Sequence, residues 1–246
     1  MSVQGKVALV TGASSGIGEA TVRTLAADGW ETVAAARRLE RCEELAREVG
    51  GHAARLDVTD PDSVKALAEG LPRVDAIVHS AGGALGLEPL AEADEERWRE
   101  MFDSNVMGVV RVTKALMPAL RRGADPIIVI VGSVAGVEVY EGGGGYTAAK
   151  HGTHAIAQTL RLELHRDGIR VSEIAPGMVE TEFSLVRFDG DAERAAGVYD
   201  GIDPLTAADV AEAIAFVAGR PGGVDVDYVS IKPTAQATAK IAHRRG

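Results

Sequence analysis

The stretch Thr11-Gly-Ala-Ser-Ser-Gly-Ile-Gly18 joins an apolar run, Lys6–Val10, to a helical pattern, Gly16–Asp28. The apolar run predicts a buried strand, and the pattern after the loop predicts a helix. Glycines at 12, 16 and 18 let the backbone turn sharply and let a diphosphate approach the helix N-terminus, whose free N–H groups and dipole favour an anion. The loop therefore predicts a dinucleotide site, and the alternative is a tight turn that needs glycine for packing only.

The same alternation of apolar runs and helical patterns continues along the chain. Further strands are predicted at Glu31–Ala36, His52–Asp57, Val74–His79, Pro126–Gly132, Ile169–Ile174 and Val226–Ile231. Further helices are predicted at Leu39–Val49, Pro61–Gly70, Asp94–Arg122, Tyr146–Arg166 and Ala207–Ala218. Pro118 should kink or end the helix that contains it. Seven strands with helical crossovers predict an α/β fold, a doubly wound and mainly parallel sheet with helices on both faces.

No linker or composition shift divides the chain, so residues 1–246 are expected to form a single domain. Its 246 residues are 46% hydrophobic and 25% charged, a composition typical of a soluble globular protein. The formal net charge of -10, without basic runs, argues against a nucleic-acid or anionic-membrane partner. The one cysteine, Cys42, excludes an internal disulfide and fits a reducing compartment. No signal peptide or membrane-spanning run is evident, so a cytoplasmic enzyme is expected.

Tyr146 and Lys150 are the first candidate catalytic pair. Four residues apart on a helix, their side chains share one face. A phenol with a pKa of about 10 is a poor base at neutral pH unless a nearby cation favours its anion. Lys150 would make Tyr146 a usable proton donor and acceptor, whereas the alternative is a pair of ordinary surface residues.

The end of the second strand bears on the choice of dinucleotide. The strand ends Ala-Ala-Ala36 and is followed by Arg37 and Arg38, where NAD would favour an acidic side chain. Two guanidiniums suit a 2′-phosphate, so NADP(H) is the expected cofactor. The alternatives are a solvated Arg-Arg pair opening a helix, and NAD.

Six motifs together resemble the short-chain dehydrogenase/reductase family over almost the whole chain. They are the loop at 11–18, Ser-Ala-Gly at 80–82, Asn105, Ser133, Tyr-Thr-Ala-Ala-Lys at 146–150 and Pro-Gly-Met-Val-Glu-Thr at 176–181. The resemblance implies a Rossmann-type fold and an oxidoreductase that moves a hydride between the nicotinamide and a secondary alcohol or its carbonyl. A non-catalytic dinucleotide sensor on the same fold is the alternative from another class.

The resemblance also implies roles for individual residues. Tyr146 would be the general acid/base, Lys150 its partner and a holder of the nicotinamide ribose, and Ser133 the hydroxyl that holds the substrate oxygen. Asn105 would anchor a water on the proton route to Lys150. The implied cofactor contacts are Gly12, Ser14, Ile17, Gly18, Arg37, Arg38, Asp57, Val58, Ala81, Gly82, Pro176, Gly177, Val179 and Thr181. Capping for Ser133, and a turn for Asp57, are the plain alternatives.

The chain departs from the family pattern at two places. His79-Ser80 replaces the usual Asn-Asn, so Ser80 would have to brace the central strands, and His79 is interpreted as structural. Four glycines, 142–145, suggest a mobile approach to the Tyr146 helix, with a plain loop as the alternative. No metal site is expected, because the histidines, including His151, His154 and His165, lack second ligands at zinc spacing and are assigned to helix surface.

A substrate loop is expected at about 180–204. Its first part, 180–191, and the stretch 229–236 resemble the branch with NADP-dependent 3-hydroxy acid (serine or allo-threonine) dehydrogenases and related aldehyde reductases. Arg187 is the candidate partner of a substrate carboxylate; the alternative is a solvated side chain, or one paired with Asp189 or Asp191. The family commonly forms tetramers, so a homo-oligomer, tetramer or dimer, is expected. The tail 235–246 has no strong pattern and is interpreted as disordered or lying across a neighbouring subunit.

Overall fold

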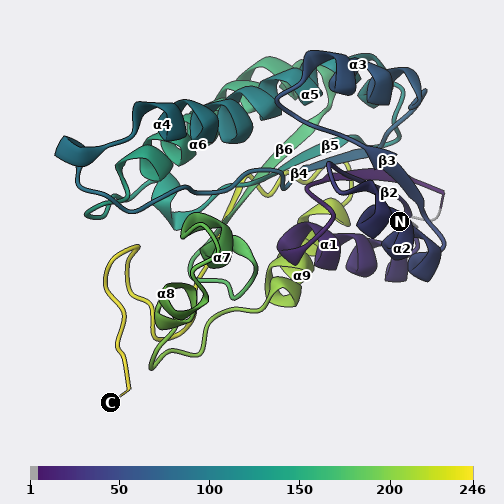
Figure 1. Cartoon of the computed structure of the whole chain (residues 1–246). Helices are drawn as coiled ribbons and strands as arrows, with labels where there is room; N and C mark the ends of the chain where they lie inside the picture. The colour runs from purple at the N-terminus through teal and green to yellow at the C-terminus, as the bar shows by residue number, and fades with distance from the viewer. Residues whose placement is uncertain (1–4, 246) are drawn as a thin grey trace.

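Seven parallel strands form one sheet in the computed structural model, which describes residues 5–245 (Figure 1). The strand order is β3-β2-β1-β4-β5-β6-β7, and all six neighbouring pairs are parallel. The strands are β1 (Val7–Thr11), β2 (Glu31–Ala36), β3 (His52–Arg55), β4 (Ala76–His79), β5 (Ile127–Val131), β6 (Arg170–Pro176) and β7 (Tyr228–Ile231). This confirms the predicted doubly wound α/β class, in which the order reverses between β1 and β4 and ligands bind beyond the carboxyl ends of the strands.

Helices cover both faces of the sheet (Figure 1). One layer holds α1 (Gly16–Ala27), α2 (Leu39–Val49) and α9 (Ala207–Ala218), and the other holds α3 (Pro61–Glu69), α5 (Gly108–Leu120) and α6 (Gly144–Leu164). Strand β5 serves both layers, because Ile127 and Val129 belong to the first core and Ile128 and Ile130 to the second. Alternate side chains of a strand point to opposite faces, which explains its unbroken apolar sequence.

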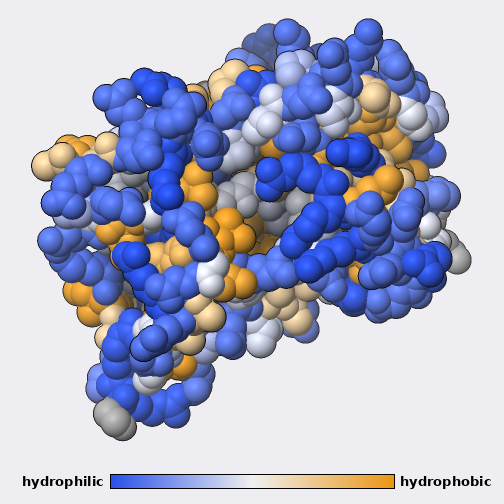
Figure 2. Space-filling model, viewed as in Figure 1, coloured by the Kyte–Doolittle hydropathy of each residue, from blue (hydrophilic) through white to orange (hydrophobic). Residues whose placement is uncertain are grey.

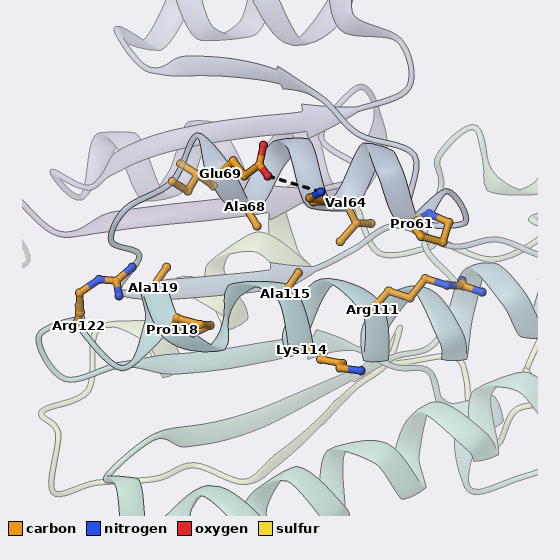
Figure 3. Close-up of a pocket in the computed structure, with 12 residues that line it drawn as sticks. Pro61, Val64, Ala68, Glu69, Arg111, Lys114, Ala115, Pro118, Ala119 and Arg122 are labelled. Carbon is orange, nitrogen blue, oxygen red and sulfur yellow. Dashed lines mark ion pairs between the residues drawn. The ribbon is translucent and has the colours of Figure 1, made fainter.

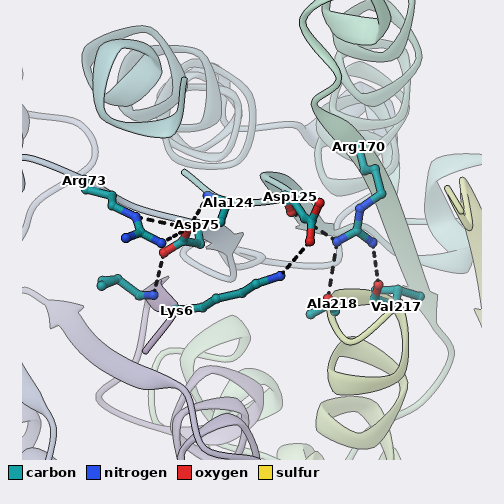
Figure 4. A network of polar contacts seen from close by, with 9 residues as sticks. Lys6, Arg73, Asp75, Ala124, Asp125, Arg170, Val217 and Ala218 are labelled. Atoms are coloured by element: carbon teal, nitrogen blue, oxygen red, sulfur yellow. Dashed lines mark hydrogen bonds and ion pairs between the residues drawn. The ribbon is translucent and has the colours of Figure 1, made fainter. Parts of the chain in front are cut away.

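Polar side chains fasten the strands together at their amino ends (Figure 4). Asp75, fully buried before β4, accepts hydrogen bonds from Val7 N at 2.8 Å and Ala124 N at 2.5 Å. Arg73 donates to the same carboxylate at 2.8 Å. Arg170, at the start of β6, donates to the Val217 carbonyl at 2.9 Å. These contacts join the starts of the central strands and the end of α9.

The long helical segment predicted at Asp94–Arg122 is divided in the structure. It consists of α4 (Glu95–Phe102), a π-helical turn at Asp103–Met107, and α5. Asp94 begins α4 by accepting hydrogen bonds from the backbone of Glu96 and Arg97. Pro118 lies in the last turn of α5, which ends two residues later at Leu120, as the sequence predicted.

Two short helices occupy the predicted substrate loop: α7 (Phe183–Arg187) and α8 (Ala192–Gly197). No helix or strand was predicted for this stretch, because five and six residues are too short for a readable hydrophobic period. The tail from 235 to 245 folds back on this segment (Figure 1). Gln236, 5% exposed, accepts a hydrogen bond from Met178 N at 2.8 Å, and Arg244 donates to the Val198 carbonyl at 3.0 Å. Residues 235–245 therefore lie across their own chain, where the sequence had suggested a tail that is disordered or lies across a neighbouring subunit; residue 246 lies outside the described residues.

Within the part of the chain that the structure describes, no helix combines the length and hydrophobicity needed to cross a membrane.

Candidate active site

Helix α6 starts unusually close to α4 because glycine occupies its first positions. A Cβ at Gly144 would lie 2.8 Å from Trp98 Cζ2, and one at Gly145 would collide with the Met101 methyl group. Only glycine fits this contact. The run at 142–145 thus has a packing function at the helix start, where the sequence had suggested a mobile approach. This contact fixes where Tyr146 and Lys150 enter the site.

Tyr146 and Lys150 share one face of α6 as predicted; Lys150 is buried and Tyr146 is half-buried. The Lys150 ammonium donates to the Val131 carbonyl at 2.9 Å and lies 5.8 Å from the centre of the Tyr146 ring. Burial lowers the pKa of Lys150 to about 8, and the Glu173 carboxylate opposes that effect. Burial raises the pKa of Tyr146 above its ordinary value, whereas a hydrogen bond with Ser133 and the positive charge of Arg187 lower it. The sequence had assigned this lowering to Lys150.

Ser133 follows β5 and takes the capping role that the sequence left as an alternative. It caps the 3-10 turn Val134–Gly136, with its hydroxyl oxygen accepting from Ala135 N at 3.1 Å. It is also 7% exposed, and it lowers the pKa of Tyr146. The cap orients the serine, and its predicted role in holding the substrate oxygen stays a prediction.

Asn105 lies in the π-helical turn between α4 and α5, a feature frequent at functional sites. Its Nδ2 donates to the Met101 carbonyl at 2.7 Å and to the Gly83 carbonyl at 3.0 Å. Its buried Oδ1 has no hydrogen-bond partner among residues 5–245. A Cβ at Gly82 would lie 2.5 Å from this oxygen, so glycine is needed there. The amide therefore keeps an acceptor available beside the loop at 82–83.

The loop at 11–18 is shaped by close backbone packing. Gly12 has φ 68°, and a Cβ there would lie 2.8 Å from Ala81 N and from the Ser80 carbonyl. A Cβ at Gly18 would lie 2.5 Å from the Gly12 carbonyl. The Ser15 side chain at the start of α1 makes no capping hydrogen bond. The packing explanation thus holds for these glycines, and the helix N-terminus also keeps N–H groups for an anion.

The central strands β1 and β4 are braced by Thr11, not by the Ser80 hydroxyl that the sequence pointed to. The Thr11 hydroxyl accepts from Ser80 N and from Ala81 N, both at 3.1 Å. His79, 3% exposed, hydrogen-bonds Thr113 at 2.9 Å, and burial lowers its pKa to about 3. This contact agrees with the structural role predicted for His79.

Arg38 follows the end of β2 and contacts the glycine loop at 11–18. It donates to the Ser14 hydroxyl at 3.1 Å, to the Ser15 hydroxyl at 2.7 Å and to Glu182 at 2.9 Å. Arg41 donates to the other oxygen of Glu182 at 2.9 Å, and the two arginines lower the pKa of that carboxyl to about 2. Glu182 thus links the predicted substrate loop to the residues after β2. Arg37 is exposed beside them.

The remaining predicted cofactor residues lie along the same edge of the sheet. Asp57 begins a turn, with one oxygen accepting from Thr59 N at 3.0 Å, which is the plain alternative noted for it. Thr181 lies against Gly16, where an added Cβ would be 3.2 Å from the threonine side chain. The others are placed by neighbouring contacts. Val58 lies against Gly108, and Gly177 lies against Gln236. Ile17 packs against the core that α1 covers, Val179 forms a bridge with Leu205, and Pro176 ends β6.

Arg187, at the end of α7, reaches Tyr146. Its guanidinium carbon lies 5.9 Å from the centre of that ring, and it donates to the Tyr140 hydroxyl at 3.0 Å and to the Gly86 carbonyl at 2.9 Å. Its Nη2 is buried and has no hydrogen-bond partner within the described range 5–245. Asp189 pairs with Arg97, and Asp191 caps α8, so neither acid takes Arg187. On the face of the molecule that Figure 2 shows, hydrophobic residues lie in a hollow at the middle, with hydrophilic residues on either side.

Comparison with known proteins decides the family. Residues 6–190 match the model of the short chain dehydrogenase family. The chain belongs to that family. It is 58% identical to an uncharacterized oxidoreductase of Mycobacterium tuberculosis, covering 95% of this chain and 93% of the other. It is 41% identical to sulfoacetaldehyde reductase 2 of Chromohalobacter salexigens, covering 96% and 97%. The solved structure described as the closed form of serine dehydrogenase complexed with NADP+ has a TM-score of 0.91 and 36% identity, covering 98% and 100%.

This short-chain dehydrogenase is therefore an oxidoreductase, and the resemblance drawn from the motifs is confirmed. Sequence reasoning missed two aromatic side chains of the site. Tyr140 contacts Arg187, and the Phe183 ring lies 5.4 Å from that of Tyr146. Neither belongs to a motif, and only the fold brings them to α6. Among the described residues, no group of three His, Cys, Asp or Glu side chains could hold a metal ion.

A second hollow lies away from this dehydrogenase site, between α3 and α5 (Figure 3). Its volume is about 530 Å³, and apolar residues such as Val64, Ala115 and Pro118 line it below a rim that includes Arg111 and Lys114. None of the predicted site residues lies in it.

Proposed function

We propose that the protein is an NADP(H)-dependent oxidoreductase for a small secondary alcohol, or its carbonyl, that carries an anionic group, as a 3-hydroxy acid does. The observation that carries the substrate class is Arg187, a cation beside Tyr146 with one buried nitrogen that still lacks a hydrogen-bond partner. A guanidinium binds a carboxylate or a sulfonate through paired hydrogen bonds. The names of the relatives agree on the anionic group, since serine carries a carboxylate and sulfoacetaldehyde a sulfonate, each on a small molecule.

Tyr146 moves the proton in this proposal. During reduction the phenol protonates the carbonyl oxygen, and during oxidation the phenolate takes the alcohol proton. Ser133 lowers the pKa of the phenol and would hold the substrate oxygen next to it. Lys150 supplies a positive charge one turn away and would hold the ribose of the cofactor. When bound, the nicotinamide supplies or accepts the hydride.

The cofactor assignment rests on the contacts of Arg38. It touches Ser14 and Ser15 of the glycine loop, so a phosphate on the adenosine ribose would find two hydroxyls and a guanidinium together. The remaining proposed nucleotide contacts are those predicted from the sequence. An NAD-dependent enzyme and a non-catalytic sensor are the alternatives. Arg38→Ala should raise KM for NADP+ roughly tenfold and leave KM for NAD+ nearly unchanged, as measured by initial rates; equal effects on both would favour NAD.

A matched substrate pair tests the substrate class. The enzyme is assayed with a 3-hydroxy acid and with its methyl ester, which keeps the alcohol and removes the charge. Arg187→Met should raise KM for the acid roughly 10- to 100-fold and change KM for the ester little, because a charge-assisted hydrogen bond contributes about 1.5–3 kcal/mol. An equal change for acid and ester would contradict the proposal.

Arg194→Met is the control for this experiment. Arg194 belongs to the same segment but stacks on Phe188, with its guanidinium carbon 4.3 Å from the ring centre, and is not among the contacts of Tyr146. Its replacement should leave the ratio of the two KM values unchanged. Tyr146→Phe tests the enzymatic assignment itself: a variant that kept full turnover would remove the proposed role of the phenol. The homo-oligomeric state and the cytoplasmic location stay predictions from the sequence.

A further inference from the structure

Glu173 is a buried carboxylate that the proposed reaction does not use. It lies in the middle of β6, 1% exposed, between Ile130 of β5 and Tyr228 of β7. Its Oε2 is 2.6 Å from His154 Nδ1, whereas its Oε1 has no hydrogen-bond partner in the described part of the chain. An ionised group buried with one oxygen unpaired is costly to keep unless another charge compensates it.

The carboxylate faces the structure that holds Lys150. A Cβ added at Gly132 would collide with Glu173 Oε1, so this oxygen lies over Gly132. Gly132 is the residue between Val131, whose carbonyl accepts from Lys150, and Ser133. Lys150 and His154 are four residues apart on α6 and therefore share the face that looks onto β6.

The hydrogen bonds orient the pair. Glu173 Oε2 lies 2.6 Å from His154 Nδ1, and His154 Nε2 lies 2.9 Å from Gln158 Nε2. Both ring nitrogens are therefore held, one by the carboxyl group and one by the amide. The histidine fixes one oxygen of Glu173, and the second oxygen stays over Gly132.

We propose that Glu173 and His154 are positioning residues for Lys150: the carboxylate supplies the negative charge that keeps this lysine an ammonium, and the histidine holds the carboxylate in place. This inference rests on the proposed function, because it assumes that Lys150 works as a cation. It explains why an acid is buried in the middle of the sheet. Since Glu173 touches no reacting atom in this proposal, it acts through the lysine alone.

The titratable groups around this cluster come from α6, α7, β7 and the loop that precedes α6. Tyr146 precedes Lys150 on α6, and Arg187 of α7 approaches Tyr146. On the other side, Tyr228 of β7 lies against His154, with ring centres 5.7 Å apart, and its pKa is raised by burial and then by Glu173 and Glu138. Of these groups, Glu173 is the one whose charge counteracts the lowering of the Lys150 pKa by burial.

Glu173→Gln tests the proposal because it removes the charge and keeps the shape. Without the carboxylate, Lys150 should lose its proton at lower pH, by about one unit, since a nearby opposite charge shifts a pKa by about 1–3 units. The alkaline limb of the kcat/KM profile should move down by the same amount. NMR titration of the ¹³Cε resonance of Lys150, assigned with Lys150→Arg, measures the ionisation without any substrate. Unchanged titration in Glu173→Gln would overturn the inference.

Three further variants make the result specific. Glu138→Gln removes a neighbouring acid whose oxygen instead accepts from Ala239 N at 2.7 Å, and should leave the profile in place. Glu173→Asp keeps the charge, so its Lys150 titration should be nearly that of the wild type. His154→Asn, which removes the residue that holds the carboxylate, takes the place of Glu173→Gln in this test if Glu173→Gln does not fold. An equal shift in Glu138→Gln would also overturn the inference. An inactive wild type with an intact Lys150 shift would count against the proposed function alone.

Discussion

Asp75 and Glu173 are two buried carboxylates of the same sheet, and they differ in how many of their oxygens have hydrogen-bond partners. Asp75, at the amino end of β4, has both oxygens occupied, one by Val7 N and the other by Ala124 N and Arg73 (Figure 4). Glu173, within β6, has one oxygen paired with His154 and one without a partner in the described residues. A fully satisfied acid fastens strands, whereas a partly satisfied one keeps its charge available to a neighbour.

The contrast extends to the two ends of the sheet. Toward the carboxyl ends, Asn105 and Arg187 also keep a buried polar atom without a partner in residues 5–245, and the pKa values of Lys150 and Tyr146 are displaced. At the amino ends, the orphaned atoms are single ones of Thr32 and Arg170. Displaced pKa values and unpaired groups are typical of functional sites. The amino ends of the strands therefore form an end where polar contacts fasten the sheet, the fastening end, and the carboxyl ends hold the proposed site.

Asp75→Asn should break the fastening end alone. The amide turns at least one N–H toward the Val7 or Ala124 backbone, which leaves a buried donor unpaired, and we expect a loss of about 3 kcal/mol in the free energy of unfolding. Arg73 adds little to this, because its side chain is 45% exposed. Urea denaturation measures the loss, and kcat at 25 °C should stay near the wild-type value.

Asp125→Asn is the matched control for Asp75. Its ion pair with Lys6, at 3.1 Å, is partly exposed, and its positive φ of 54° is one that asparagine adopts readily. We expect less than about 1 kcal/mol from this change. Equal losses in the two variants would contradict the special position of Asp75, and a large fall in kcat for Asp75→Asn would erase the division between the two ends.

Much of the fold was readable from the sequence because local patterns determine it. Apolar runs such as Ile127–Val131 mark strands buried on both faces, and the glycine loop marks the first crossover. The spacing of Tyr146 and Lys150 was enough to place them on one face, since a helix makes one turn in 3.6 residues. Strand ends shifted by one or two residues, where fraying and capping outweigh the hydrophobic period.

The remainder of the site depends on contacts between distant parts of the chain. Arg187 is defined by Gly86 and Tyr140, which lie 101 and 47 residues earlier. The assignment of His154 to the helix surface was wrong, because its partner Glu173 comes from β6. An acid in the middle of a buried strand was the available signal for that pair. Which side chain it meets depends on how α6 lies on the sheet, and no local pattern encodes that.

Lys150→Met combined with Glu173→Gln should sharpen the comparison in the opposite direction to Asp75→Asn, removing activity while adding stability. The pKa of Lys150 is about 8 in the folded protein and 10.5 in an unperturbed lysine, so the folded state binds the proton more weakly than the unfolded state does. At pH 7 the buried ammonium therefore costs folding free energy, and replacing both charged groups with neutral side chains, so that no buried carboxylate is left uncompensated, should raise stability by about 2 kcal/mol.

The pH dependence distinguishes this gain from a general packing effect. Between about pH 8 and 10.5 the unfolded wild type holds the lysine proton and the folded wild type does not, so wild-type stability from this group rises with pH and the advantage of the double variant should shrink across that window. Lys114→Met, at an exposed position of α5, should show neither the gain nor the shrinkage. If the double variant were no more stable than the wild type at pH 7, the ammonium would not be a cost to folding, and Lys150 would belong with Asp75 among the residues that fasten the sheet.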